Sequence, residues 1–471
     1  MMALNDPSGS TNGFERGNHI DRVLLIAGCA GEPSFRSLAA PASPLRLRRG
    51  EPEKETPMLI MVFTCIVVMT TLLPGAAGAQ ERLAPLSRED AIRMALERNP
   101  TLQAKQRELQ SVRANETTAA LWPNPTFNYL AEQFGATGQP QYTVSVGQTI
   151  ETGGKRGRRI ESARAATRVT GYELEDVRRQ VIFQTQKAFT DVLVAQASQA
   201  LAAANLTTLD ELERIQRLRA EHGDISQLDL NRIQIQRFTF ERDAADAAQA
   251  VQAAKIALRS VVGAGVLTEP VEVSGELTFR DLSLTREGLY QLAVMNRPDL
   301  RAAQAAFEKA QADVNLARAN AWWDVTPLVE YQRIQNDNTI GFGISLPIRI
   351  FDRNQGEIAR AKAEVQRLSA VSRAAAIQAL AEVDTAWSVA MTERDKVHRL
   401  REIYLPKARQ ARDTVEFAYR RGGLSLLDFL DAQRAYRETA LGEIQAVGNY
   451  ESALNQLESA VGASLDEPRS R

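Results

Sequence analysis

The sequence predicts a mainly α-helical protein with a small β part that lies in a membrane, built from two copies of one unit. Three observations lead to this fold class. The 471-residue chain repeats its own pattern at an offset of about 198 residues, which indicates a duplication. Each copy contains two short segments in which polar and apolar residues alternate, as in β-strands. Each copy also contains a very long tract rich in Ala, Gln, Arg, Leu and Glu, which favours helix.

The duplication is visible in two registers. Residues 86–89 recur at 284–287, and residues 99–102 recur at 297–300, 198 positions later. After a slip of one residue a second group matches: Gly223, Ser226, Leu228, Asp229 and Gln234 correspond to Gly422, Ser425, Leu427, Asp428 and Gln433. We therefore expect a first repeat at 84–270, a second repeat at 282–466 and a short tail at 467–471.

Each repeat opens with a helix. A hydroxyl residue, Ser87 or Thr285, precedes this helix and can cap its first turn. Pro100 and Pro298 interrupt the two helices near their beginning, because proline lacks the N–H that a helix interior requires. The helices are predicted to end at about residues 121 and 322.

A proline-rich junction then changes the hydrophobic period to two, as expected for strands. In the first repeat, strands are predicted at 126–130 and 142–150, with a Gly/Pro turn between them. In the second repeat, they are predicted at 325–334 and 339–350. The β part therefore occupies about 126–150 and 325–350.

Long helical tracts follow the strands, at about 156–221 and 357–420. They end at glycine turns, and a further helix of about 36 residues begins after each turn, at Ser226 or Ser425. At 1.5 Å per residue, the long helices span about 100 Å and the shorter ones about 50 Å. Because charges occur throughout them, we expect these helices to project into an aqueous compartment.

The strand count predicts an oligomer. Four strands in one chain cannot close a barrel, and open strand edges are not tolerated in lipid. Several chains must therefore contribute strands to one shared barrel.

The N-terminal part is expected to be absent from the working protein. An apolar run at 58–73, followed by small residues up to Ala79, is typical of a signal peptide at 58–79. Residues 1–57 are rich in Pro, Gly and Arg without periodicity, and we interpret them as a disordered upstream extension from a misassigned start codon. Cys29 follows a lipoprotein-like box, but the preceding apolar run is short, so we interpret this match as a coincidence.

Composition excludes several classes of function. Basic and acidic residues number 57 and 58, so a nucleic-acid partner has no electrostatic support. Both cysteines, Cys29 and Cys65, precede the predicted mature start, which leaves no thiolate site and no disulfide. The two remaining histidines, His222 and His398, are far apart and no glycine-rich phosphate loop is present, so we predict neither an enzyme nor a bound cofactor.

Three junction motifs resemble those of one known family. Pro123-Asn124-Pro125 precedes the first strand, 148–156 joins the second strand to the long helix, and 351–356 occupies the equivalent place in the second repeat. With the duplicated order of helix, two strands and two helices, these motifs make 84–466 similar to the TolC-type outer-membrane efflux proteins. The motifs resemble the cobalt-zinc-cadmium resistance (CzcC-like) branch of that family.

The resemblance implies a homotrimer with a twelve-stranded outer-membrane β-barrel, four strands per chain, on a long periplasmic α-helical barrel. The implied partners are a periplasmic adaptor (membrane fusion) protein, an inner-membrane resistance-nodulation-division pump and outer-membrane lipid. The implied function is passive export of heavy-metal cations from a Gram-negative cell. Two alternatives stay open: the same duct exporting drugs or other small molecules, and a non-channel structural coiled-coil surface protein. The strand hairpins and the duplication argue against the second alternative.

The resemblance also assigns roles at the two glycine turns. It places adaptor docking at Gly223, Ser226, Gly422, Gly423 and Ser425. Asp428 and Asp431 share a helix face, and in a trimer each would form a ring of three carboxylates that constricts the pore and attracts cations. The alternative role for Asp428 is a helix cap.

A latch at the tip is implied as well. Asp229 and Tyr419 match residues that fasten neighbouring tip helices together in the closed state. Leu424 stands where the family has an arginine, and Arg420 and Arg421 are the candidates to replace it from a turn away.

Two further charged clusters have more than one interpretation. Glu221, His222 and Asp224 form a weak candidate for transient zinc binding, or an ordinary solvated turn. A basic cluster follows the strands in both repeats: Lys155, Arg156, Arg158, Arg159, Arg349, Arg353 and Arg360. These residues would bind anionic headgroups or helix C-termini, or form a solvated face.

Overall fold

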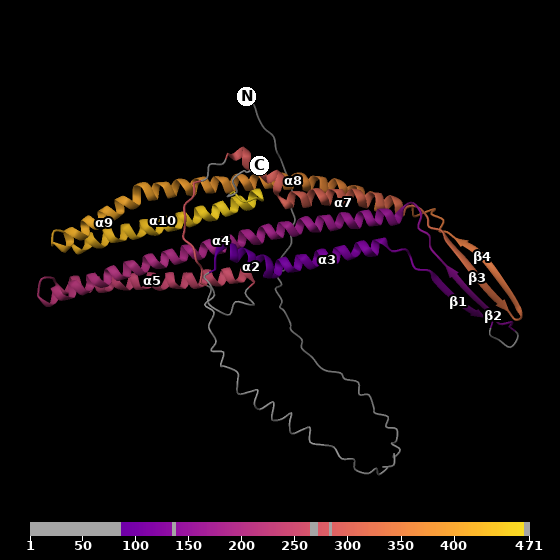
Figure 1. Ribbon diagram of the computed structural model, residues 1–471, viewed down its shortest axis with the longest axis horizontal. Coiled ribbons are helices and arrows are strands. Elements are labelled where there is room, and N and C mark those ends of the chain that lie inside the picture. Colours follow the sequence, from indigo (N-terminus) through magenta and orange to yellow (C-terminus); the bar gives the residue numbers. More distant parts are fainter. Residues whose placement is uncertain (1–85, 134–137, 264–271, 282–284, 466–471) are drawn as a thin grey trace, which may run out of the picture. The chain divides into compact units, whose positions relative to one another are not determined.

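The computed structural model describes residues 86–133, 138–263, 272–281 and 285–465 (Figure 1). All of them belong to one compact unit, Arg82–Arg471. The expected upstream extension at 1–57, the signal peptide at 58–79 and the tail at 467–471 lie outside the described residues, as do both cysteines.

The two repeats contain the same elements in the same order. The first repeat consists of α2 (Arg88–Arg98), α3 (Pro100–Ala120), β1 (Thr126–Glu132), β2 (Gln141–Gly147), α4 (Lys155–Glu221) and α5 (Gln227–Val262). The second repeat consists of α6 (Arg286–Asn296), α7 (Pro298–Asn320), β3 (Thr326–Ile334), β4 (Asp337–Ser345), α8 (Gln355–Arg399), η1 (Leu400–Tyr404), α9 (Leu405–Arg420) and α10 (Leu426–Val461). The predicted duplication and the mainly helical fold with a β part are confirmed.

Four of the described helices, α2, α3, α5 and α10, begin at a side chain that caps the first turn. The Ser87 hydroxyl accepts a hydrogen bond from the Asp90 N–H, as predicted. Thr285 makes no such bond, so the cap predicted for the second repeat is wrong. The first turn of α6 is held instead by Arg286, which donates to Asp384 of α8 at 2.6 Å. Proline begins α3 and α7, where its missing N–H would have had no helical partner.

The two long helices differ in regularity. α4 runs for 67 residues without a break, whereas its counterpart widens into the π-helix η1 just before Pro406. The proline ring displaces a carbonyl of the preceding turn, and a π turn accommodates that displacement. By length and composition, α4 is the one described helix able to cross a membrane. A bilayer requires only about 20 residues, and α4 packs against α3, α5, α7 and α10.

The four strands form one antiparallel sheet in the order β1-β2-β3-β4, so the two repeats meet at β2 and β3. β1 and β4 are the edges, and each has one unpaired side in the described part of the chain. β2 and β4 end at Gly147 and Ser345, earlier than predicted. Pro347 cannot donate a ladder hydrogen bond, and beyond β2 only Ile150 forms an isolated bridge, with Val325.

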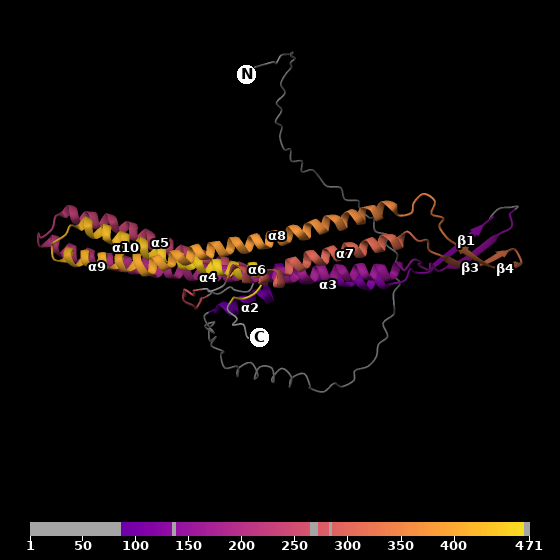
Figure 2. The same cartoon turned by 90° about the horizontal axis from the view of Figure 1, so that it is seen from above.

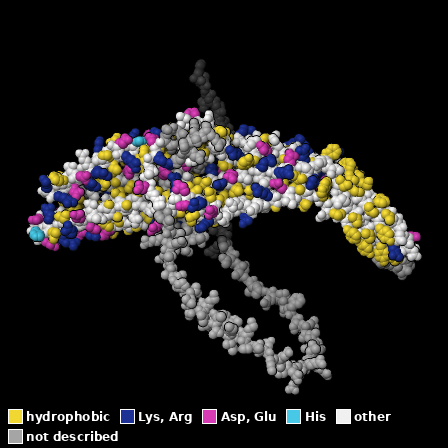
Figure 3. Space-filling view, viewed as in Figure 1, with side chains coloured by type: hydrophobic (Ala, Val, Ile, Leu, Met, Phe, Trp, Pro, Cys, Tyr) yellow, Lys and Arg dark blue, Asp and Glu magenta, His cyan; other side chains and the backbone are white. Residues whose placement is uncertain are grey.

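The sheet has one apolar and one mainly polar face, because side chains alternate along a strand. The apolar face carries the exposed residues Phe127, Tyr129, Val146, Val329, Tyr331, Ile340, Phe342 and Ile344. The opposite face carries mainly polar and small residues, with Leu130, Leu328 and Ile334 as exceptions. Figure 3 shows hydrophobic side chains gathered over the sheet, whereas the helices display mixed charges. This pattern is typical of strands between lipid and water.

The helices pack closely where small side chains allow it. α4 contacts α5 and α10, and α8 contacts α7 and α10. Gly448 of α10 lies so close to Val194 of α4 that an added Cβ would overlap that side chain. Figure 2 shows the turns of the α4–α5 and α9–α10 hairpins at the end of the helices away from the strands. We call this end the tip, and it consists of residues 221–226 and 420–425 with the helix ends that flank them.

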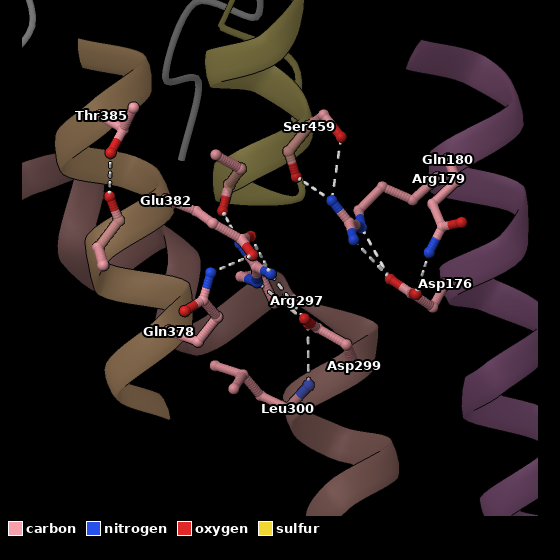
Figure 4. Close-up of polar contacts among 12 residues, drawn as sticks. Asp176, Arg179, Gln180, Arg297, Asp299, Leu300, Gln378, Glu382, Thr385 and Ser459 are labelled. Carbon is pink, nitrogen blue, oxygen red and sulfur yellow. Dashed lines mark hydrogen bonds and ion pairs between the residues drawn. The ribbon is translucent and has the colours of Figure 1, made fainter. Parts of the chain in front are cut away.

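In each repeat, the residue before the proline that divides the two opening helices binds the end of the last helix of that repeat. In the first repeat, the Asn99 side chain donates to Val261 O, near the end of α5, at 2.7 Å. In the second repeat, the equivalent Arg297 donates to Ala460 O of α10 at 2.9 Å and also binds carboxylates of α7 and α8 (Figure 4). The same backbone crossing is thus held by an amide in one repeat and by a buried guanidinium in the other.

Candidate functional site at the tip

The two turns of the tip have nearly the same backbone. Gly223 has φ 79° and donates to Ala220 O at 3.0 Å, while Gly422 has φ 77° and donates to Tyr419 O at 2.9 Å. A positive φ favours glycine, which explains its place in both turns. Ser226 caps α5 and its equivalent Ser425 caps α10. The residues predicted to dock an adaptor therefore lie in well-formed, exposed turns, and their docking role stays a prediction.

A buried aromatic cluster lies beneath the turns and joins the two hairpins. Tyr419 of α9 stacks on Phe429 of α10, with ring centroids 5.3 Å apart and planes inclined by 23°. They pack with buried apolar residues of both hairpins: Leu209, Leu212, Ile233, Phe240 and Leu426. The position of Tyr419 is thus set by packing.

Tyr419 and Asp229 lie near each other, but the described structure contains no hydrogen bond between them. Burial raises the pKa of the Tyr419 hydroxyl; the positive charge of Arg219 opposes this rise and the Asp229 carboxylate adds to it. Asp229 accepts a hydrogen bond from the Ser226 hydroxyl at 3.0 Å and pairs with Arg232 at 3.5 Å. Asp229 therefore acts on the Tyr419 hydroxyl through its charge alone, and the latch stays a prediction.

The two arginines predicted to complete the latch are bound within their own helical hairpin. Arg420 pairs with Glu416 at 2.6 Å. The Arg421 guanidinium lies 4.2 Å from the centroid of the Phe417 ring. Either arginine would have to leave its present partner to fasten a neighbouring helix.

Asp428 and Asp431 have different surroundings although they share a helix face. Asp428 accepts hydrogen bonds from the Ser425 hydroxyl at 2.7 Å and from the Ser425 N–H at 3.1 Å, which completes a capping box. These bonds hold the pKa of Asp428 below its usual value. Asp431 is exposed and has no ion pair or hydrogen bond from its side chain in the described part of the chain. Asp428 is therefore a helix cap, and Asp431 is the less engaged carboxylate of the predicted ring.

Sequence reasoning missed a buried carboxylate between the helices of the first hairpin. The Glu213 side chain is 5% exposed and binds Arg237 of α5 at 2.8 Å and Arg217 at 2.6 Å. The hydrogen bond from Arg237 is the main cause that lowers the pKa of Glu213. Arg237 also pairs with Asp210 at 3.1 Å and with Glu241 at 2.8 Å. A signal was present in the sequence, because Glu213 follows Leu206 and Leu209 at the spacing of one helix face.

Glu221, His222 and Asp224 do not form a metal site, so this weak candidate is wrong. The His222 ring contacts Leu218 O at 2.7 Å. In the described ranges, no group of three or more His, Cys, Asp or Glu side chains could hold a metal ion. The physical reason is that a backbone carbonyl of its own helix already occupies a ring nitrogen of His222, and the exposed turn does not bring the two carboxylates to that ring.

Three arginines of the basic cluster below the strands are bound to helix ends, and other members pair with carboxylates. Arg156 and Arg159 donate to carbonyl oxygens of the last turn of α3 at 2.7 and 3.0 Å, and Arg349 donates to the last carbonyl of α7 at 2.6 Å. Lys155 pairs with Asp324 at 2.7 Å. Helix C-termini leave carbonyl groups without helical partners, so for these arginines the helix-end alternative is confirmed.

Most of the chain matches a known family. Residues 91–264 and 289–463 fit the family model described as outer membrane efflux protein. The chain belongs to this family. Members of the family are channel proteins, which places this chain in the outer membrane of a Gram-negative cell with its helices in the periplasm and confirms the predicted family and localisation.

Two relatives carry the names of metal-resistance proteins. The cobalt-zinc-cadmium resistance protein CzcC of Cupriavidus metallidurans is 26% identical over 385 residues, which cover 81% of this chain and 91% of the relative. The nickel-cobalt-cadmium resistance protein NccC of Alcaligenes xylosoxydans xylosoxydans is 26% identical over 322 residues, 67% of this chain and 71% of the relative. These relatives confirm the resemblance to the CzcC-like branch.

The fold is also shared with solved channel structures. The open state of the MtrE outer membrane channel of Neisseria gonorrhoeae superposes with a TM-score of 0.68 at 20% identity, covering 80% of this chain and 89% of that chain. The predicted fold class is thereby confirmed.

Proposed function

We propose that three copies of the chain form one duct through the outer membrane, and that this duct passively exports heavy-metal cations. A resistance-nodulation-division pump in the inner membrane supplies the energy, and a periplasmic adaptor connects the pump to the tip. This protein contributes the wall of the duct, its length and its tip.

The observation that carries the proposal is the unfinished sheet. β1 and β4 each leave one edge unpaired among the described residues, and the apolar face is exposed, with Phe342 84% and Phe127 67% accessible. In lipid, each unpaired backbone N–H or C=O group costs several kcal/mol, so other copies must pair with both edges. Four strands from each of three copies would give twelve, which lies within the range of outer-membrane barrels.

Exposed apolar side chains on the helices also indicate that other copies of the chain pack against this one. Ile235 and Phe238 of α5 are 74% and 67% exposed, and Phe417 of α9 is 57% exposed. Large apolar side chains that gather on a surface are typical of a surface that is covered in an assembly.

The metal cargo rests on the relatives and on the charge of the tip. Both relatives described above are named for resistance to cobalt and cadmium. Threefold symmetry would repeat Asp431 as three carboxylates near those of Asp428, and such rings attract cations and repel anions. A tight metal site is not required, because a permeant ion must leave as readily as it enters. The exposed tip turns offer the surface for the adaptor.

The metal sensitivity of a deletion strain tests the cargo. Loss of zinc, cobalt or cadmium tolerance, restored by the gene on a plasmid, is the expected result. Loss of tolerance to dyes or antibiotics alone would replace metal ions with organic molecules as the cargo.

A matched pair of substitutions on β4 tests the barrel. Phe342→Lys places a charge on the apolar face, which costs about 2–4 kcal/mol at the middle of a bilayer, so it should reduce the amount of trimer in the outer membrane. Thr339→Lys places the same charge on the polar face of the same strand and should be tolerated. Equal tolerance of both substitutions, or a water-soluble monomer that needs no detergent, would contradict the proposed duct.

A further inference from the structure

On the polar face of the described sheet, every charged residue is acidic. The strand register places Glu132, Glu330 and Asp337 on this face. Arg333 is the one basic residue of the described strands, and it lies on the opposite face, near the end of β3. The polar face therefore carries negative charge that no basic strand residue neutralises.

Glu330 lies at the middle of this face. It is the central residue of the nine-residue strand β3, directly opposite Ser145 on one side and Gly341 on the other. Glu330 is half-buried and makes no side-chain hydrogen bond or ion pair in the described ranges. A Cβ added to Gly341 would have nothing within 4 Å, so the space beside Glu330 is open. An ionised carboxylate without a partner requires water, which indicates that this face borders an aqueous space.

In a shared barrel the polar face becomes the wall of the pore. Three copies would place three Glu330 carboxylates at one level, halfway along the strands, where the surrounding lipid strengthens their effect on a passing ion. By Coulomb's law in water, three charges about 10 Å from an ion favour a monovalent cation roughly eightfold without screening and about twofold at 0.1 M salt.

We propose that Glu330 is a cation-selecting residue of this channel, forming an acidic ring in the membrane part that is separate from the carboxylates of the tip. The ligands are small hydrated cations in transit. Glu132 and Asp337 belong to one row across the sheet and lie on its two edge strands, so closure of the barrel brings acidic residues of adjacent copies together at the end of the strands. The inference rests on the proposed trimeric duct, because one subunit contains no ring.

Reversal potentials in planar lipid bilayers test this role. The background is the purified channel with Asp428→Asn and Asp431→Asn, because the tip carboxylates would otherwise mask the β part. The screened ring favours a cation about twofold and disfavours an anion about twofold, so adding Glu330→Gln should lower the cation-to-anion permeability ratio about fourfold at 0.1 M salt. Glu330→Asp should retain most of the ratio. Arg333→Gln, which removes a charge from the other face of the same strand, is the matched control and should leave the ratio unchanged.

The possible outcomes separate this inference from the proposed duct. If the unmodified protein does not conduct, the duct itself is refuted. If it conducts and Glu330→Gln leaves the permeability ratio at its background value, Glu330 does not select cations and the inference is wrong. At 1 M salt the Debye length is only about 3 Å, so the effect of Glu330→Gln should disappear. An effect that persists at 1 M salt would show a change in pore shape and would also refute the electrostatic role.

Discussion

Replacing the buried Arg297 by methionine should destabilise the second repeat strongly. The Arg297 side chain is 2% exposed and donates to Ala460 O at 2.9 Å. It also binds Asp299 at 2.6 Å and Glu382 at 2.7 Å. These two carboxylates are partly accessible, with exposed fractions of 30% and 42%. Arg297→Met removes all of these bonds while filling much of the same volume.

The expected cost follows from what each partner loses. A buried carbonyl such as Ala460 O that loses its donor costs about 1–3 kcal/mol. The two carboxylates can turn to water, so each loses no more than about 1 kcal/mol. The substitution should therefore cost about 2–4 kcal/mol in total. Asn99→Ala is the equivalent change in the first repeat, and because it removes one donor and one helix cap it should cost about 1–2 kcal/mol.

Thermal unfolding of the purified channel, followed by far-ultraviolet circular dichroism, checks this order. Arg297→Met should lower the Tm more than Asn99→Ala does. Arg297→Lys should fall between wild type and Arg297→Met, because lysine keeps the charge but cannot bind several partners in the planar geometry of arginine. A Tm of Arg297→Met equal to that of wild type would refute the reasoning.

The pH dependence of the Tm gives an independent check of the same pair. Burial alone would raise the pKa of Asp299, but the hydrogen bonds and charge of Arg297 lower it below the usual value. The stability that this pair contributes is therefore fully present above the usual pKa of aspartate and is lost as the pH falls through the lowered pKa. Arg297→Met should make the Tm fall less in acid than the Tm of wild type does. If both proteins lose the same Tm in acid, Asp299 does not contribute to the acid dependence of stability.

Three further predictions concern the tip. Asp428→Ala removes the capping box and should speed proteolysis at the start of α10. Asp431→Asn should leave proteolysis unchanged and lower the cation preference of single channels. If Asp428→Ala does not change the rate of proteolysis, Asp428 is not a cap. Glu213→Gln leaves two arginines without their buried acceptor and should cost about 1–2 kcal/mol, measured as faster amide exchange in α4 and α5. Because the pKa of Glu213 is lowered, wild type should lose the stability contributed by this carboxylate only as the pH falls through and below the usual glutamate range. Equal exchange rates of wild type and Glu213→Gln at neutral pH would contradict the stabilising role of Glu213. Tyr419→Ala empties the aromatic cluster and should raise the conductance of the closed channel, while Tyr419→Phe keeps the ring and should change it little; a large rise for Tyr419→Phe would assign closure to the contact of the hydroxyl with Asp229.

Local sequence patterns predicted the elements closely because the forces behind them act over a few residues. Ser226 and Ser425 begin α5 and α10 as predicted, since a cap needs only the next three residues. Pro100 and Pro298 divide the opening helices for a similarly local reason. Thr285 shows the limit of such reasoning, because a contact between Arg286 and α8 holds that helix start instead.

The chemistry of the site could be predicted only in part. Both roles of Asp428 were foreseen, but only the geometry of Ser425 shows that the carboxylate caps the helix. The Glu213 pair with Arg237 was not foreseen, because it joins positions 24 residues apart on two helices. Nor could sequence show that the basic residues after the strands bind the ends of α3 and α7.

By itself, the sequence determined the duplication, the order and approximate bounds of the elements, and the need for several chains to complete one barrel. Periodicity, caps and strand number depend on residues that are close in the sequence, so they can be recognised without knowing how the helices and strands pack. Only the tertiary structure decided that Arg297 binds a carbonyl 163 residues away and that Glu330 shares a face with Ser145 and Gly341. A shift of one residue in strand register would exchange the two faces, and burial and charge pairing depend on which distant segments the fold brings together.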